Sequence, residues 1–196
     1  MVLPIVAYGN PILKKEAQEV DPTSEEVQEL IDNMWETMYN ASGVGLAAPQ
    51  VGKSWRIFII DPSPFAGDDR LDEDEKKELE SLQETFINPE IIEEDGNEWN
   101  FEEGCLSIPD VREDVFRKPE ILIAFLDRKG QKHEKRFKGL AARVIQHEYD
   151  HIQGVLFTDK ISGLKRRLIK AKLNAIAKGK INVEYRMKFP KLKTKK

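Results

Sequence analysis

The sequence predicts an α+β fold in which short antiparallel strands pack around a central helix, with further helices toward the N-terminal and C-terminal ends. Apolar or alternating segments follow one another between residues 85 and 137 without helical stretches between them, which favours antiparallel pairing over a parallel α/β sheet. Residues 139–153 have helical spacing, with Leu140, Val144, His147 and His151 on one face. This stretch is the expected central helix.

Two further helices are expected outside this core. The first begins at Thr23, where Thr23 and Glu26 form a T-x-x-E capping box, and it ends near residues 41–43. The other spans 162–178, while Gly154 is placed to end the central helix. The expected strands are 55–61, 85–92, 97–108, 111–118, 120–127, 132–137 and 181–189. The glycine-containing segment 43–52 is expected to be a functionally placed loop.

Length and composition predict one soluble domain over residues 1–196 with an uneven charge distribution. The formal net charge is -4, which gives no reason to expect DNA binding. Residues 66–84 are strongly acidic and are expected to form an exposed, partly helical surface insertion that the core does not need. Residues 165–196 are basic, and the tail 190–196 either touches an anionic partner such as RNA or is simply solvated.

The single cysteine, Cys105, excludes a disulfide within the chain and argues for a reducing compartment. The first residues lack the basic and apolar regions of a secretory signal. No segment approaches the roughly 18 apolar residues that span a bilayer. We therefore expect a cytoplasmic protein without a membrane partner.

The segment HEYDH, residues 147–151, predicts a metal site on the central helix. Two histidines four residues apart project from one helix face, so both imidazoles can reach one ion. Glu148 is rotated about 100° around the helix axis from His147, which sets it beside the ion rather than on it. A carboxylate there can accept a proton from an attacking water and pass it to a leaving group.

The third protein ligand is left open by spacing alone. A catalytic metal usually takes three protein ligands, often with a Glu or His as the third. Downstream of His151 there is no histidine, and the only glutamate is Glu184, in an expected strand. Cys105 offers a soft thiolate within a turn-like segment, although a lone cysteine is ordinarily a small buried apolar residue. His133, between Lys132 and Glu134, is read as exposed and structural.

Three ordered segments resemble the peptide deformylase family. They are GVGLAAPQ at 43–50, EGCLS at 103–107 and QHEYDH at 146–151, matching the family patterns GxGLAAxQ, EGCLS and QHExDH. The similarity runs from about residue 3 to 160, interrupted by the acidic insertion. The resemblance implies hydrolytic removal of the N-terminal formyl group from the initiator methionine of new proteins, with release of formate.

The resemblance also implies a role for each residue of the reacting centre. It makes Cys105, His147 and His151 the metal ligands and Glu148 the general base and acid. Gln50 and the backbone N–H of Leu106 would donate to the formyl oxygen as its charge develops. It implies Fe²⁺ in the cell, with Zn²⁺, Ni²⁺ or Co²⁺ as possible replacements, whereas the ligand types alone suit either Zn²⁺ or Fe²⁺.

Substrate contacts follow from the positions of the remaining motif residues. Formyl-Met nascent peptides are the expected partner, and the glycines Gly43 and Gly45 are expected where the substrate backbone approaches closely. The residues expected to line an apolar methionine pocket are Val44, Leu140, Val144 and His147.

Arg112 is a candidate for the substrate main chain, and Arg143 is expected near the pocket mouth. Gln146 and Asp150 are expected to support the metal ligands, with Arg117 pairing with Asp150. The alternative is that Gln146 and Asp150 are ordinary polar residues on the helix surface. The basic C-terminal region is expected to contact the ribosome transiently.

Three other functions are compatible with parts of this pattern. A metallopeptidase would cleave unformylated peptides, and a cysteine hydrolase using Cys105 as nucleophile would keep its activity after chelation. A metal-stabilised binding module for nascent chains or RNA would tolerate replacement of Glu148 by alanine.

Overall fold

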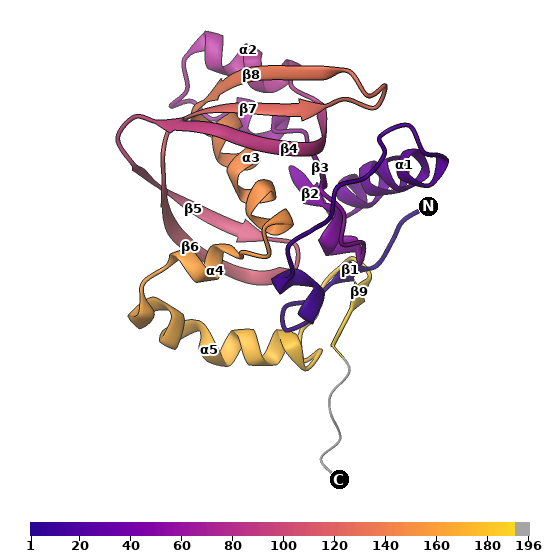
Figure 1. Cartoon of the computed structure of the whole chain (residues 1–196). Helices are drawn as coiled ribbons and strands as arrows, with labels where there is room; N and C mark the ends of the chain where they lie inside the picture. The colour runs from indigo at the N-terminus through magenta and orange to yellow at the C-terminus, as the bar shows by residue number, and fades with distance from the viewer. Residues whose placement is uncertain (191–196) are drawn as a thin grey trace.

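The computed structural model describes residues 1–190, and its central element is helix α3, Gly139–Ile152. Figure 1 shows α3 between one face of the main sheet and a hairpin formed by β5 (Trp99–Cys105) and β6 (Ile108–Arg117). The helix contacts strands β2, β3, β7 and β8, and most of its residues are buried. After Gln153 the chain turns at Gly154, whose φ of +72° is a conformation that favours glycine, in agreement with the predicted helix end.

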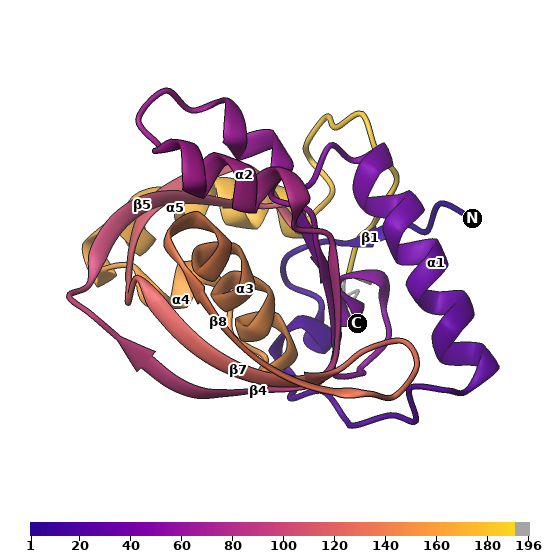
Figure 2. The same ribbon diagram turned by 90° about the horizontal axis from the view of Figure 1, so that it is seen from above.

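The main sheet is antiparallel and has the order β2-β3-β4-β7-β8. Its strands are β2 (Gly45–Ala47), β3 (Ile57–Ile60), β4 (Glu84–Asp95), β7 (Glu120–Leu126) and β8 (Lys132–Lys138). In β7 buried and half-buried residues alternate, as expected for a strand with one face on the core. Figure 2 shows β4, β7 and β8 curving around α3. The expected loop at 43–52 is thus a short edge strand followed by a 3₁₀ helix, η2 (Ala48–Val51).

The second layer is the hairpin of β5 (Trp99–Cys105) and β6 (Ile108–Arg117). Its register shifts between Gly104 and Cys105, because Cys105 pairs with Ile108 across a tight turn. Leu106 and Ser107 form that turn. The irregularity releases the end of β5 from regular pairing and brings the turn beside α3.

The remaining helices cover the outside. They are η1 (Pro11–Lys14), α1 (Glu25–Asn40), η3 (Ser63–Gly67), α2 (Glu73–Ser81), α4 (Phe157–Lys160) and α5 (Gly163–Ala177). The expected capping box at Thr23 is wrong: Ser24 caps α1 by accepting the Val27 N–H, while Thr23 bonds to Asp21. Helix α5 packs along β6 (Figure 1).

The ends of the described chain pair with each other. Strand β9, Met187–Lys188, lies parallel to β1, Ile5–Val6. The strand expected over 181–189 is therefore limited to two residues, because only β1 offers it a partner. The predicted tail at 190–196 lies outside the described residues except for Pro190.

The acidic segment 66–84 is exposed and partly helical, as expected, but it also contributes to the core. Leu79 of α2 is fully buried and joins the cluster around Phe58, Phe86 and Leu140. Asp72 caps the N-terminus of helix α2, since its side chain accepts hydrogen bonds from the N–H groups of Asp74 and Glu75. The expectation that the core does not need this segment is wrong, since both Ala66 and Leu79 are buried in that cluster.

The α+β class and the antiparallel main sheet confirm the predicted fold, with the small parallel pair β1–β9 as the exception. Within residues 1–190, no helix has both the length and the apolar character required for crossing a membrane.

Candidate active site

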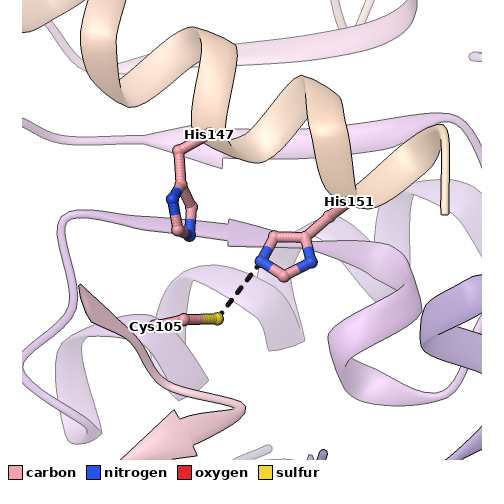
Figure 3. A group of neighbouring side chains, drawn as sticks. All are labelled: Cys105, His147 and His151. Carbon is pink, nitrogen blue, oxygen red and sulfur yellow. Dashed lines mark hydrogen bonds between the residues drawn. The ribbon is translucent and has the colours of Figure 1, made fainter. Parts of the chain in front are cut away.

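The fold brings together three side chains that can share one metal ion. Cys105 lies at the end of β5, and His147 and His151 lie on one face of α3 (Figure 3). Their ligand atoms all lie within 4.8 Å of one another, and Cys105 Sγ is 3.3 Å from His151 Nε2. The regular geometry of a helix is enough to set the two histidines on one face. The Cys105 thiol lies near them only because the hairpin turns beside α3.

The orientation of the two imidazoles fits a metal site. His147 Nδ1 is 2.9 Å from Glu103 Oε2, which leaves its other ring nitrogen for an ion. Burial, followed by the charge of His147, lowers the pKa of His151 well below its ordinary value. Burial also acts to lower the pKa of His147, but hydrogen bonds with Cys105 and Glu103 raise it well above that value. One thiolate and two imidazoles form a donor set suited to Zn²⁺, Fe²⁺ and related ions.

Glu103 anchors a buried network behind this cluster. Arg117 donates to both of its carboxylate oxygens, at 2.6 and 2.9 Å, and Arg143 donates to Oε1 at 3.0 Å. Burial acts to raise the pKa of Glu103, but the hydrogen bonds from Arg117 and His147 hold it well below its usual range. The network fixes the ring of His147. Sequence reasoning missed Glu103, although a carboxylate two residues before a candidate thiolate ligand was a usable signal.

Arg143 does not lie at a pocket mouth, so that expectation is wrong. Its side chain is buried beneath Trp99, with the guanidinium 4.5 Å from the ring centre, and it also donates to the carbonyl oxygens of Trp99 and Val115. The helix turns it toward Glu103, where its charge is compensated.

Glu148 is buried against β2. A Cβ added at Gly45 would lie 2.5 Å from Glu148 Oε1, so only glycine lets the strand approach this carboxylate. Among the described residues, Glu148 Oε2 is buried and has no hydrogen-bond partner. Burial raises the pKa of Glu148 to about 7.

Gln50 and the Leu106 turn face the same cluster from the other side. Gln50 Oε1 accepts the Ala47 N–H at 2.8 Å, which turns the amide nitrogen toward Cys105 Sγ at 3.5 Å and Ser107 Oγ at 3.3 Å. Gln50 is 1% exposed, so its amide has a fixed direction. Ser107 is a second contact that the sequence did not single out.

The residues predicted to contact substrate comprise three apolar side chains, the glycines and Arg112. Val44 packs against the core cluster to which Leu140 and Val144 belong, and these two lie one turn apart on α3. A Cβ on Gly43 would lie 2.8 Å from the Leu106 side chain, so here the close neighbour is the chain itself. Arg112 is paired with Gly104 across the hairpin and is 69% exposed; its nearest carboxylate, that of Glu102, is 4.0 Å away.

The three predicted supporting residues are not all beside the ligands. Arg117 donates to Asp150 at 2.7 Å while holding Glu103, so it links the C-terminal half of α3 to β5. Gln146 instead donates to Glu94 of β4 at 2.7 Å, which ties α3 to the sheet. His133 is half-buried rather than exposed: it stacks on Phe125 and bonds to Asp127 at 2.8 Å.

The fold and the site together define a metal-dependent hydrolase of the HExxH type, with Glu148 on the same helix as the two histidines. A family model described as polypeptide deformylase matches residues 2–167. The chain belongs to the peptide deformylase family, and it is therefore an enzyme that removes the N-terminal formyl group from the initiator methionine of newly synthesised proteins.

Individual relatives agree over nearly the whole length. A peptide deformylase of Christiangramia forsetii is 65% identical over 193 residues, covering 98% of each chain. That of Flavobacterium johnsoniae is 58% identical over 189 residues, covering 96% of each chain. The crystal structure of a peptide deformylase from Legionella pneumophila has a TM-score of 0.77 at 38% identity, covering 92% of this chain and 98% of that one.

Proposed function

We propose that Cys105, His147 and His151 hold one divalent ion and that Glu148 moves the proton during hydrolysis of the formyl amide. The observation that carries this assignment is the buried Oε2 of Glu148, which has no hydrogen-bond partner within the described residues and directly follows His147 of the three-ligand group. When bound, the ion supplies Lewis-acid activation of water and of the formyl carbonyl.

Glu148 would accept the proton of the attacking water and then deliver it to the leaving amine of methionine. Its burial against Gly45 holds the carboxylate in one position and keeps bulk water away. Formate and a free methionine amine are the products.

Gln50 and Leu106 would stabilise the negative charge that develops on the formyl oxygen. The Gln50 side-chain amide has a fixed direction because the Ala47 N–H holds its carbonyl oxygen. The amide therefore needs little reorientation as charge develops on the formyl oxygen. The backbone N–H of Leu106 belongs to the turn that follows Cys105, which places a second donor close to the same ligand.

The methionine side chain would rest on the apolar surface of Val44, Leu140 and Val144, beside His147. Strand β2 is the edge of its sheet, so the substrate backbone can pair along Gly43–Gly45 as an added strand. Arg112 would contact the substrate main chain further on, since its side chain is exposed to solvent. Asp150 and Arg117 would steady the ligand helix, and Gln146 would steady its contact with β4.

We propose Fe²⁺ as the cellular ion, with Zn²⁺, Ni²⁺ and Co²⁺ as replacements. The donor set of one thiolate and two imidazoles binds all four. Chelation is expected to abolish formate release from formyl-Met-Ala-Ser, and each ion restored under anaerobic conditions is expected to return activity to a different degree. Acetyl-Met-Ala-Ser should give almost no product, because the larger acyl group does not fit. Absence of formate with every ion would contradict the proposal, and full activity after chelation would point to chemistry on Cys105 alone.

We also propose a cytoplasmic enzyme that touches the ribosome through its basic C-terminal region. Helix α5 presents exposed Arg167 and Lys170 beside Leu164 and Leu168, which are 62% and 73% exposed. Such a face suits an RNA surface with nearby apolar contacts. Deleting residues 190–196 is expected to weaken ribosome co-sedimentation at low salt while leaving formate release unchanged. If co-sedimentation is unaltered, the tail has no part in the contact.

A further inference from the structure

The C-terminal segment after α5 returns to the active-site side of the molecule. The family model ends at residue 167, so this segment lies beyond the matched region. Its backbone is tied to the N-terminal strand, since the Ile5 N–H donates to the Arg186 carbonyl at 2.8 Å and the Ala7 N–H donates to that of Lys188 at 2.9 Å. These bonds fix the place of Tyr185, the residue just before them.

Tyr185 reaches the turn that carries the proposed backbone donor. Its hydroxyl donates to the carbonyl oxygen of Leu106 at 2.8 Å. Burial raises the pKa of this phenol, so the hydroxyl stays protonated and able to donate. Within residues 1–190, this is the one side-chain hydrogen bond from the C-terminal segment to the turn.

The turn has two other anchors, and they hold its second residue. The Tyr8 N–H donates to the Ser107 carbonyl at 2.8 Å, and Gln50 Nε2 donates to Ser107 Oγ at 3.3 Å. Leu106 itself sits where the ladder of β5 and β6 shifts register, so regular strand pairing does not orient it. Its carbonyl is therefore held from outside the hairpin, by Tyr185.

We propose that Tyr185 is a positioning residue for deformylation, which fixes the Leu106 turn so that the Leu106 N–H points at the developing oxyanion. This inference rests on the proposed role of Leu106. The Leu106 N–H belongs to the preceding peptide group, so the Tyr185 bond acts on it through the Leu106 Cα that joins the two groups. By holding the carbonyl, the hydroxyl limits displacement of this Cα and therefore of the N–H beside it. A donor gives its full effect only when aimed at the position where the charge develops. The C-terminal segment thereby acts on the reaction without touching substrate.

The test is Tyr185→Phe, which deletes the hydroxyl and keeps the ring. Loss of one hydrogen bond that acts through the oxyanion donor is expected to lower kcat about 3- to 10-fold, with KM within about twofold of the wild type. Metal content should be unchanged, and the exchange of the Leu106 amide proton should accelerate. Thr37→Val is the matched control, because the Thr37 hydroxyl accepts the Leu3 N–H and donates to Asn33 without contact with the turn. It should lose stability to a similar degree and keep kcat.

Gln50→Ala separates a failure of the positioning role of Tyr185 from a failure of the proposed function. If Gln50→Ala lowers kcat and Tyr185→Phe does not, the positioning role is wrong while the proposed function stands. A fall in kcat that is matched by Thr37→Val, or that follows lost metal, would reduce Tyr185 to a stabilising contact and overturn the inference. If the wild-type protein releases no formate from formyl-Met peptides, it is the proposed function that fails.

Discussion

Replacing Glu148 by alanine is expected to leave the metal bound and to lower kcat by about 10³- to 10⁴-fold, the upper part of the range for a general acid–base group. Glu148 is adjacent in sequence to His147 but is not one of the three residues that can bind an ion together. Loss of its carboxylate therefore removes the proton acceptor and donor without removing a ligand. Formate release from formyl-Met-Ala-Ser, with the metal measured in the same sample, checks this.

Glu148→Gln is the sharper companion variant, because it keeps the shape packed against Gly45. It should be as inactive as the alanine variant and should melt close to the wild type. Retention of more than about a tenth of wild-type kcat by both variants would rule out Glu148 as the proton-transfer group, since a single general acid–base residue is worth at least about 10².

Glu103→Gln is expected to destabilise the protein by about 3–5 kcal/mol, because it leaves two buried guanidinium groups without their shared charge partner. Arg117 and Arg143 are 4% and 3% exposed at the side chain, and both donate to Glu103. For a chain of this length that loss corresponds to a melting temperature roughly 10 °C lower. His147 also loses the partner of its Nδ1, so metal affinity should fall about 10-fold or more.

The matched control is Glu102→Gln, one residue earlier in the same strand and directed to solvent. Glu102 is 62% exposed, and its nearest cation, Arg112, is 4.0 Å away, so little change in stability or metal affinity is expected. Thermal unfolding and metal titration of the two variants side by side provide the measurement. Equal behaviour of the two would show that the buried network does not stabilise the site.

The central helix and its chemistry were predictable because they depend on local spacing. Two histidines four residues apart need only a helix to face the same way, and α3 has the apolar face that makes the helix form. The antiparallel class was predictable for the same reason, from alternation within short segments. Cys105 was different: spacing left its role open, and only the ordered motifs favoured it as a ligand.

What could not be predicted depends on contacts between distant segments. Arg143 looked like a charge at a pocket mouth, but the hairpin covers that face of α3 with Glu103 and Trp99. Strand β9 is short because its partner β1 is short, and a sequence pattern gives no partner length. Tyr185 and Leu106 are 79 residues apart, and Tyr185 lies beyond the region that the family model matches, so their contact follows from no local rule.

The proposed ligand set takes one side chain from a hairpin and two from a helix, with consequences beyond catalysis. An ion held by Cys105, His147 and His151 is a cross-link between two layers of the fold, in a chain whose single cysteine cannot form an internal disulfide. Because an ion that binds only the folded chain raises its stability by mass action, the occupied enzyme should resist heat better than the stripped one. Oxidation of the Cys105 thiolate would open this cross-link and disable the enzyme in the same event.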